Sequence, residues 1–383
     1  LVNNSSVKKI AILKRIEKYL IIFRILLFFG FLFSIYFFWG KALLWVIIAL
    51  FCIFFSMSSL LLNKFDKRLD LYNRYIKLME ADKLYFQNVH SDDFSEHIPE
   101  NHPFAYDLDI LGKNSLFSHI NRTVTVMGKY MLMDWIINPH LDKDSIIKKQ
   151  NAVKELSDKN SFKSIFRIAG SMFTGGEDND ITNFKQWLQE DDNKAQNRTL
   201  KFLLYSIIST NCLILVLVIS GVLSPYILMN SILFFGILSL YKEREIDVLH
   251  EKISKGILAM NTYADLLEIV SKEEFHSELL CEWKNSLFRS EYDAIKSLRK
   301  GNSIGKMLDQ RKNLMLHFFF EGIMGWQIIQ IFRMKKWKEQ YRYNIVQWLE
   351  IIGQFDAVIS LSLYADRHPE YIFPTISDEK GKY

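Results

Sequence analysis

The sequence predicts an all-α protein in which two transmembrane helical hairpins accompany a cytoplasmic helical core with long helices. Three observations indicate this. Apolar residues gather in two long blocks, although they make up only 49% of the 383 residues. The chain has 6 Pro and 16 Gly, which favours long helices over a turn-rich β fold. Outside the blocks, apolar residues recur every three or four positions, and strand patterns are weak.

The first apolar block runs from Ile25 to Leu62 and is interrupted at residues 39–42 by the sequence WGKA. Each half is close to the ~20 residues with which a helix crosses a bilayer. The second half has no charged residue, and Arg24 before the first can reach the membrane surface with its long side chain. A cleaved signal peptide fits poorly, because the apolar region is too long and lacks a small-residue cleavage site.

The second block runs from Phe202 to Tyr241, holds no charge and is interrupted at residues 221–225 by GVLSP. Asn211 and Asn230 are its most polar side chains, and such amides can hydrogen-bond across a helix pair. Both blocks therefore predict helical hairpins. The alternative is a water-soluble protein that buries two apolar hairpins in its core.

Basic residues flank the blocks, whereas the two hairpin turns together hold only Lys41. The flanking residues are Lys8, Lys9, Lys14, Arg15, Lys18, Arg24, Lys64, Lys67, Arg68, Lys201, Lys242 and Arg244. Because basic loops stay on the cytoplasmic side, we expect a multi-pass protein of a bacterial-type inner membrane with both termini in the cytoplasm. The expected parts are a tail (1–18), hairpin 1 (19–63), a first helical core part (64–200), hairpin 2 (201–241) and a second core part (242–383).

The first core part contains the stretch LFSHINRTVTVMGKYMLMDWIINP, residues 116–139. Its apolar residues have helical spacing, so we expect one helix that ends before Pro139, followed by a helix capped by Asp142 or Asp144. Thr123, Thr125 and Gly128 are poor residues for a helix interior. Their presence predicts a kink or a close contact with another helix.

Two long helices are expected in the second core part. An apolar stripe from Ile246 to Val270 predicts antiparallel packing against other helices. A second helix is expected from about Asn313 to Ala365. Its apolar first half contains Glu321, so we favour a buried core helix over a fifth membrane span, because ionisable groups are costly in lipid.

The sequence holds no recognisable catalytic, cofactor or metal motif. Residues 301–308, GNSIGKML, lack the spacing of a phosphate-binding loop, and Met307 stands where Ser or Thr would be needed. Cys52, Cys212 and Cys281 form no CxxC pair. We therefore expect no enzyme activity, cofactor or metal in this chain. A basic cluster with interleaved aromatic residues suggests contact with DNA phosphates, and the alternative is a solvated helix face. It comprises Arg333, Lys335, Lys336, Lys338 and Arg342.

Two segments carry a family resemblance. In the first, residues 101–156, the pattern is formed by Asn121, Arg122, Thr123, Thr125, Gly128, Leu132, Trp135 and Pro139, with Val153 and Leu156 in the next helix. In the second, residues 348–376, it is formed by Asp356, Ala357, Ser360, Leu361, Ala365, Tyr371 and Pro374. These segments resemble the beginning and end of the core, or lever, domain of MutS-type DNA mismatch-repair proteins. The stretch HPFAYDLDILGKNSLF is similar to short, membrane-associated members.

The resemblance implies lever helices that lead to a C-terminal ATPase domain, with binding of mismatched DNA, ATP and magnesium, and homodimer formation. The chain ends at Tyr383, about where that ATPase domain begins in the family. We therefore expect a non-catalytic lever module, with ATP and magnesium bound only by the missing domain. The family's mismatch-recognition domain and DNA clamp have no clear counterpart.

The expected partners are the membrane, DNA and a second copy of the chain. The first hypothesis is a membrane-anchored lever module, and the second is a DNA-binding module held at the membrane. The third is a structural membrane protein that assembles through its helical stripe at 242–270 without binding DNA.

Overall fold

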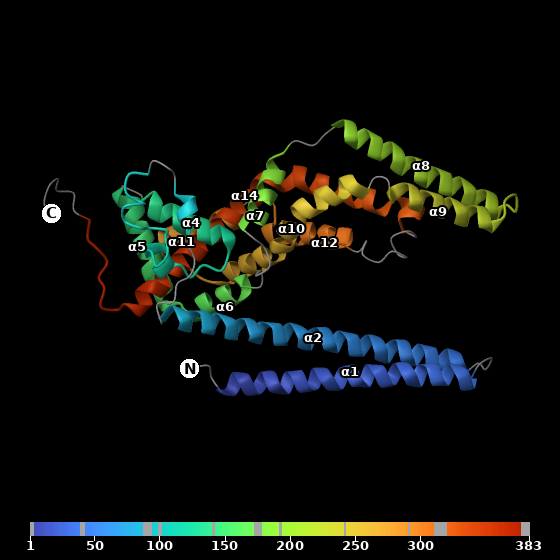
Figure 1. The fold of residues 1–383 in the computed structure, drawn as a ribbon, viewed down its shortest axis with the longest axis horizontal. Helices are drawn as coiled ribbons and strands as arrows, with labels where there is room; N and C mark the ends of the chain where they lie inside the picture. Colours follow the sequence, from blue (N-terminus) through green and yellow to red (C-terminus); the bar gives the residue numbers. More distant parts are fainter. Residues whose placement is uncertain are drawn as a thin grey trace. The chain divides into compact units, whose positions relative to one another are not determined.

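The computed structural model describes residues 4–38, 43–86, 94–98, 102–139, 142–171, 178–190, 194–240, 243–289, 292–309 and 320–376. All regular structure in these ranges is helical, which confirms the all-α prediction. The chain forms two compact units, Leu1–Ser91 and Asp92–Tyr383 (Figure 1). Each is described by itself.

The first unit is a pair of long helices, α1 (Asn4–Phe38) and α2 (Leu43–Phe86). The rings of Phe31 and Phe51 stack with centroids 4.1 Å apart, and the Arg24 guanidinium lies 4.5 Å from the centre of the Phe55 ring. The interruption expected at 39–42 lies outside the described residues. The expected boundary between residues 63 and 64 falls inside α2, which continues without a break to Phe86.

The second apolar block forms the helices α8 (Lys194–Ile219) and α9 (Pro225–Leu240), which lie side by side (Figure 1). Gly221 adopts a left-handed φ of 77° and ends α8, while the N–H groups of Val222 and Leu223 donate to Leu217 O. The break predicted at 221–225 is therefore confirmed.

Large apolar side chains on this pair are widely exposed. Examples are Phe202 (77%), Ile219 (77%), Leu213 (62%), Met229 (62%) and Phe234 (61%). The core of this chain therefore does not bury α8 and α9. Among the described residues, three helical stretches are long and apolar enough to cross a membrane, namely Val46–Lys83, Lys201–Ile219 and Trp326–Arg367.

The core of the second unit is built from helices around α14. Its members are α3 (Leu116–Ile120), α4 (Val126–Ile137), α5 (Lys143–Asp158), α6 (Asn160–Gly170), α7 (Asp178–Gln189), α10 (Glu243–Lys272), α11 (Glu278–Phe288), α12 (Ala294–Asp309) and α14 (Trp326–Arg367). A short 3-10 helix, η1 (Ser95–His97), precedes them. The two largest fully buried side chains of this core, Trp337 and Trp348, both come from α14. Burial of such aromatic residues makes α14 the central helix of the unit.

Helix α14 is 42 residues long, or about 63 Å at ~1.5 Å per residue. It runs from the α8–α9 hairpin at one end of the unit to α4 and α5 at the other (Figure 1). The single helix expected from about Asn313 is interrupted: residues 320–324 are helical, Gly325 adopts a left-handed φ of 61°, and α14 begins at Trp326. The expected start itself lies outside the described residues. Residues 310–319 lie outside the described residues.

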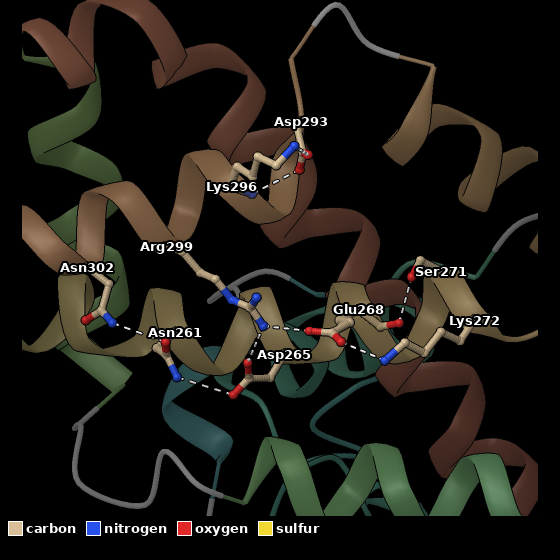
Figure 2. A network of polar contacts seen from close by, with 9 residues as sticks. All are labelled: Asn261, Asp265, Glu268, Ser271, Lys272, Asp293, Lys296, Arg299 and Asn302. Atoms are coloured by element: carbon tan, nitrogen blue, oxygen red, sulfur yellow. Dashed lines mark hydrogen bonds and ion pairs between the residues drawn. The ribbon is translucent and has the colours of Figure 1, made fainter.

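Helices α10 and α12 pack antiparallel, and a polar network fixes their register. Figure 2 shows Arg299 of α12 between Asp265 and Glu268 of α10, with N···O distances of 3.2 and 2.6 Å. The Asn302 side chain donates to Asn261 Oδ1 one turn further on, at 3.2 Å. The apolar stripe of α10 faces this packing, since Ile257, Met260, Tyr263, Leu267 and Val270 are each at most 2% exposed. The described part of the stripe is therefore not an open assembly surface.

The single helix expected for residues 116–138 is also wrong. The chain forms α3, an extended segment and then α4. The side-chain oxygen of Asn121 accepts from the Thr123 N–H (3.1 Å) and the Thr123 hydroxyl (2.6 Å), which holds the backbone out of a helix. Thr125 then caps α4 by accepting from the Gly128 N–H at 2.9 Å.

Candidate functional site

A buried carboxylate joins the start of α4 to the C-terminal third of α14. Asp356 is fully buried, and its Oδ2 accepts hydrogen bonds from the Val124 N–H (3.0 Å), the Thr125 N–H (2.7 Å) and the Thr125 hydroxyl (2.7 Å). These donors lie at the positive end of the α4 dipole, which favours an anion there. We call this contact the α4–α14 joint. It connects residues 231 positions apart in the sequence.

Two glycines allow the helices to approach at the joint. A Cβ on Gly128 would lie 2.2 Å from Asp356 Oδ2, and a Cβ on Gly353 would lie 2.9 Å from the Met127 backbone. Any side chain larger than hydrogen would therefore push the helices apart. The predicted close contact at Gly128 is confirmed, and it explains why a residue of low helix propensity is used here.

The segment before α4 is held by the next turn of α14. The Ser360 hydroxyl donates to Ile120 O at 2.8 Å and accepts from the Arg122 N–H at 2.7 Å. Arg122 thus meets α14 through its backbone N–H, Thr125 meets it through its backbone N–H and its hydroxyl, and Asn121 shapes the segment through its side-chain oxygen. The spacing of these residues in the sequence does not reveal these contacts.

The electrostatics of the joint depend on burial. Burial raises the pKa of Asp356 to about 6, although the hydrogen bonds from Thr125 and Val124 and the charge of Arg167 lower it. Burial also raises the pKa of the neighbouring Tyr263 phenol. The Asp356 carboxyl therefore gains or loses its proton near pH 6.

Trp135 and Pro139 lie apart from the joint and line a groove. The groove has a volume of about 860 Å³ and is formed by α4, α5, the end of α14 and the extended residues after it. The Lys149 ammonium lies 3.8 Å from the centre of the Trp135 ring, and burial lowers its pKa to about 8 against the opposing effect of Asp134 and Asp142. Leu132 is fully buried and also reaches the groove.

The segment after α14 packs along α5. The Gln150 side chain donates to Pro374 O at 3.0 Å, and the Lys154 ammonium lies 4.8 Å from the centre of the Phe373 ring. Tyr371 and Ile372 remain 58% and 90% exposed. The described C-terminal end of the lever is therefore held by the same helix that follows α4.

The five basic candidates for DNA contact do not share one surface. Arg333 and Lys336 are exposed, and Lys335 and Arg342 are partly buried. Lys338 is only 3% exposed, donates to Glu190 O at 2.6 Å and lies 4.8 Å from the centre of the Trp187 ring. Lys338 is thus a buried side chain that ties α14 to the end of α7, so it is withdrawn as a phosphate contact. The other four remain predictions.

Some residues that organise the site carry no signal in the sequence. Lys163 of α6 is 1% exposed, forms an ion pair with Asp366 of α14 and donates to Ser157 O at 2.7 Å. A lysine on a helix is usually solvated, so its burial could not be expected. Only the tertiary approach of α6 to the end of α14 reveals this role.

The opposite end of α14 meets the α8–α9 hairpin through a second polar contact. Asn211 in the middle of α8 donates to Gly322 O (2.7 Å) and Ile323 O (3.1 Å), and accepts from the Ser231 hydroxyl of α9 (2.8 Å). The expected amide bond across the helix pair is confirmed for Asn211. Asn230 is exposed.

The α4 side of the joint and the α4–α5 wall of the groove lie within a segment that matches a known family model, whereas α14 lies outside that segment. The model, described as MutS domain III, matches residues 98–300, which is more than half of the chain. The searches of curated proteins and of solved structures found no match. The match covers the family pattern from Asn121 to Pro139, the helices α3 to α11 and the first part of α12. The chain therefore belongs to the MutS family, through its domain III.

Proposed function

We propose that the chain is a membrane-anchored MutS lever module that is not itself catalytic. It would carry motion along α14 between its C-terminal end and the α8–α9 hairpin. The observation that supports this most directly is the α4–α14 joint, a buried polar contact between close-packed helices. Such a contact has one preferred geometry, so displacement of α14 must displace α4.

The membrane part of the proposal rests on exposed apolar surface. Helices α8 and α9 present a continuous series of exposed apolar side chains, and α1 and α2 do the same in the first unit. Water-soluble proteins rarely expose apolar patches of such extent, whereas lipid covers them at no cost. A bacterial-type inner membrane with both termini in the cytoplasm agrees with the basic flanks.

The family membership supports coupling to an ATPase domain. ATP and magnesium would be bound by that domain and not by this chain. Among the described residues, no group of three or more His, Cys, Asp and Glu is arranged to hold a metal ion. A GxxxxGK[ST] motif encoded downstream of Tyr383 is the expected finding. A reading frame without it would remove the ATPase from the proposal.

The lever can be tested with spin labels in the whole protein, reconstituted in liposomes. A label at Ile372 marks one end of the module and a label at Leu213 marks the other. For each position, the distance between the two labels of a homodimer is measured. We expect a magnesium–nucleotide analogue to change both distances. In Gly128→Ala the changes at positions 372 and 213 should both be reduced, because the new Cβ would collide with Asp356 and separate α4 from α14.

Gly30→Ala is the matched control, because a Cβ there would meet no atom within 4 Å. It should behave like the wild type. A wild-type protein in which position 213 does not respond to nucleotide would contradict the lever function.

DNA binding is a second candidate, favoured by the exposed Arg333 and Lys336. If phosphates contact these side chains, Arg333→Glu with Lys336→Glu should abolish a salt-dependent affinity for duplex DNA. Lys300→Glu, an exposed lysine on α12, is a matched charge control. No binding by the wild type at low salt would leave the structural alternative, a membrane protein that does not bind DNA.

A further inference from the structure

The start of α14 runs alongside the first half of α8. The Lys201 ammonium lies 5.7 Å from the centre of the Phe332 ring, Ile207 packs with Ile328, and Asn211 binds the carbonyl oxygens of Gly322 and Ile323. Residue numbers rise in α8 as they fall in the partner segment. The two segments are therefore antiparallel neighbours over residues 201–211 and 322–332.

The antiparallel register determines how deep residues 320–332 lie along the apolar stretch of α8. The apolar stretch Lys201–Ile219 has 19 residues, or about 28 Å of helix, which is close to the ~30 Å hydrocarbon core of a bilayer. Asn211 lies ten residues after Lys201, about 15 Å along the helix and near its midpoint. Whatever binds Asn211 lies at the same level.

Residues 322–325 pack directly against α8 and α9, so they lie near the level of Asn211. A Cβ on Gly322 would lie 2.0 Å from Ile232 O of α9, so the backbone of this residue touches the backbone of the hairpin. Gly325 packs on Leu204, with a Cβ position 3.0 Å from Leu204 Cδ1. The segment therefore meets both helices of the hairpin.

The distribution of side chains on residues 320–332 is that of a segment in lipid. The polar residues Glu321, Gln327 and Gln330 are 1%, 3% and 0% exposed, and Glu321 Oε2 accepts from the Gln327 N–H at 2.8 Å. The side chains that remain accessible are apolar. They are Phe320 (41% exposed) and the partly buried Ile323, Met324, Trp326, Ile329 and Phe332. The first exposed charge is Arg333, one residue past the level of Lys201.

We propose that residues 320–332 form a re-entrant membrane segment that reaches the bilayer midplane beside α8, so that α14 begins inside the membrane. Its partner is the acyl-chain region of the lipid, continuous with the exposed apolar face of α8 and α9. A polar residue inside the membrane needs a partner, and Glu321 meets this need through the Gln327 backbone. Arg333 then lies at the membrane surface, where basic residues anchor cytoplasmic boundaries.

This inference rests on the proposed membrane anchoring, and one experiment separates the two. Single spin labels are placed in a variant without native cysteines, in the full chain in liposomes. The labelled positions are Phe320 and Ile329 in the segment, Leu213 on α8 and Tyr343, which lies further along α14 and is 76% exposed. Collision rates with oxygen, which enters lipid, and with a nickel chelate, which stays in water, are measured at each position.

We expect labels at 320, 329 and 213 to collide mainly with oxygen, and the label at 343 mainly with nickel. A lipid-like result at 213 with nickel collisions at both 320 and 329 would overturn the re-entrant segment and leave the anchoring intact. Nickel collisions at 213 as well would overturn the anchoring and the segment together. Using two positions in the segment guards against a label that disturbs one of them.

Discussion

At the scale of single residues, Asp356 decides how α4 meets α14. One oxygen of its carboxylate satisfies two backbone donors and one hydroxyl in a fully buried place. A buried donor without a partner costs about 1–3 kcal/mol, so the whole arrangement depends on this side chain.

Replacing Asp356 tests this dependence. In Asp356→Ala the N–H groups of Val124 and Thr125 lose their acceptor, and we expect a loss of about 3 kcal/mol in unfolding free energy. Asp356→Asn keeps one oxygen toward Thr125 and should lose less. Denaturant unfolding of both variants in the same detergent measures the difference, and equal losses would argue against the hydrogen bonds as the cause.

The raised pKa of Asp356 also predicts a pH dependence. The carboxyl binds its proton more tightly in the folded chain, where its pKa is about 6, than in the unfolded chain, where the ordinary pKa of 3.8 applies. Its contribution to stability is therefore fully present below about pH 4, falls as pH rises to about 6 and is constant above. Thermal midpoints of the wild type relative to Asp356→Asn should decline across this window. A flat difference would show that Asp356 ionises normally.

At the scale of helices, close packing at glycines sets register more strongly than surface ion pairs do. The network around Arg299 is partly exposed and therefore weak (Figure 2). Gly305 on the same helix is buried, and a Cβ there would lie 2.2 Å from Ile257 Cγ2.

We expect Gly305→Ala to cost about 1–3 kcal/mol through overpacking, and Arg299→Gln to cost less. Chemical denaturation of the two variants beside the wild type gives the comparison. If Arg299→Gln proves the more harmful change, the polar network is what holds α10 on α12.

The sequence predicted helices well where periodicity is long and uninterrupted. The α8–α9 hairpin and the stripe of α10 follow from apolar spacing alone, and Asp142 caps α5 as expected, accepting from the Ser145 N–H at 2.9 Å. The break at residues 121–125 could not be placed, because it depends on the Asn121 side chain and on Asp356, 231 positions after Thr125. The burial of Lys163 and Lys338 likewise depends on tertiary contacts.

At the scale of the whole molecule, α14 links two polar contacts of different kinds. The α4–α14 joint lies toward its C-terminal end, and the Asn211 contact lies just before its start. Between them the helix buries Trp337 and Trp348, which gives it a continuous support. Helix α14 is therefore packed against other helices along the stretch between the two contacts.

The Asn211 contact can be tested against a neighbouring amide. Asn211→Leu leaves two carbonyl oxygens and the Ser231 hydroxyl without their partner, and we expect a loss of about 1–3 kcal/mol. Asn230→Leu, at an exposed amide on α9, should be close to neutral. Thermal unfolding in lipid nanodiscs measures both, and similar effects would mean that Asn211 has no special place in the hairpin.

The 231 positions that separate Thr125 from Asp356 also determine how long after Thr125 the ribosome adds Asp356 during translation. At ~5–20 residues per second, a ribosome needs roughly 10–50 s to add the carboxylate after it has made the threonine. During that interval the α8–α9 hairpin is synthesised, while the backbone donors before α4 have only water as partner. Asp356 can therefore reach the start of α4 only after the α8–α9 hairpin has been synthesised.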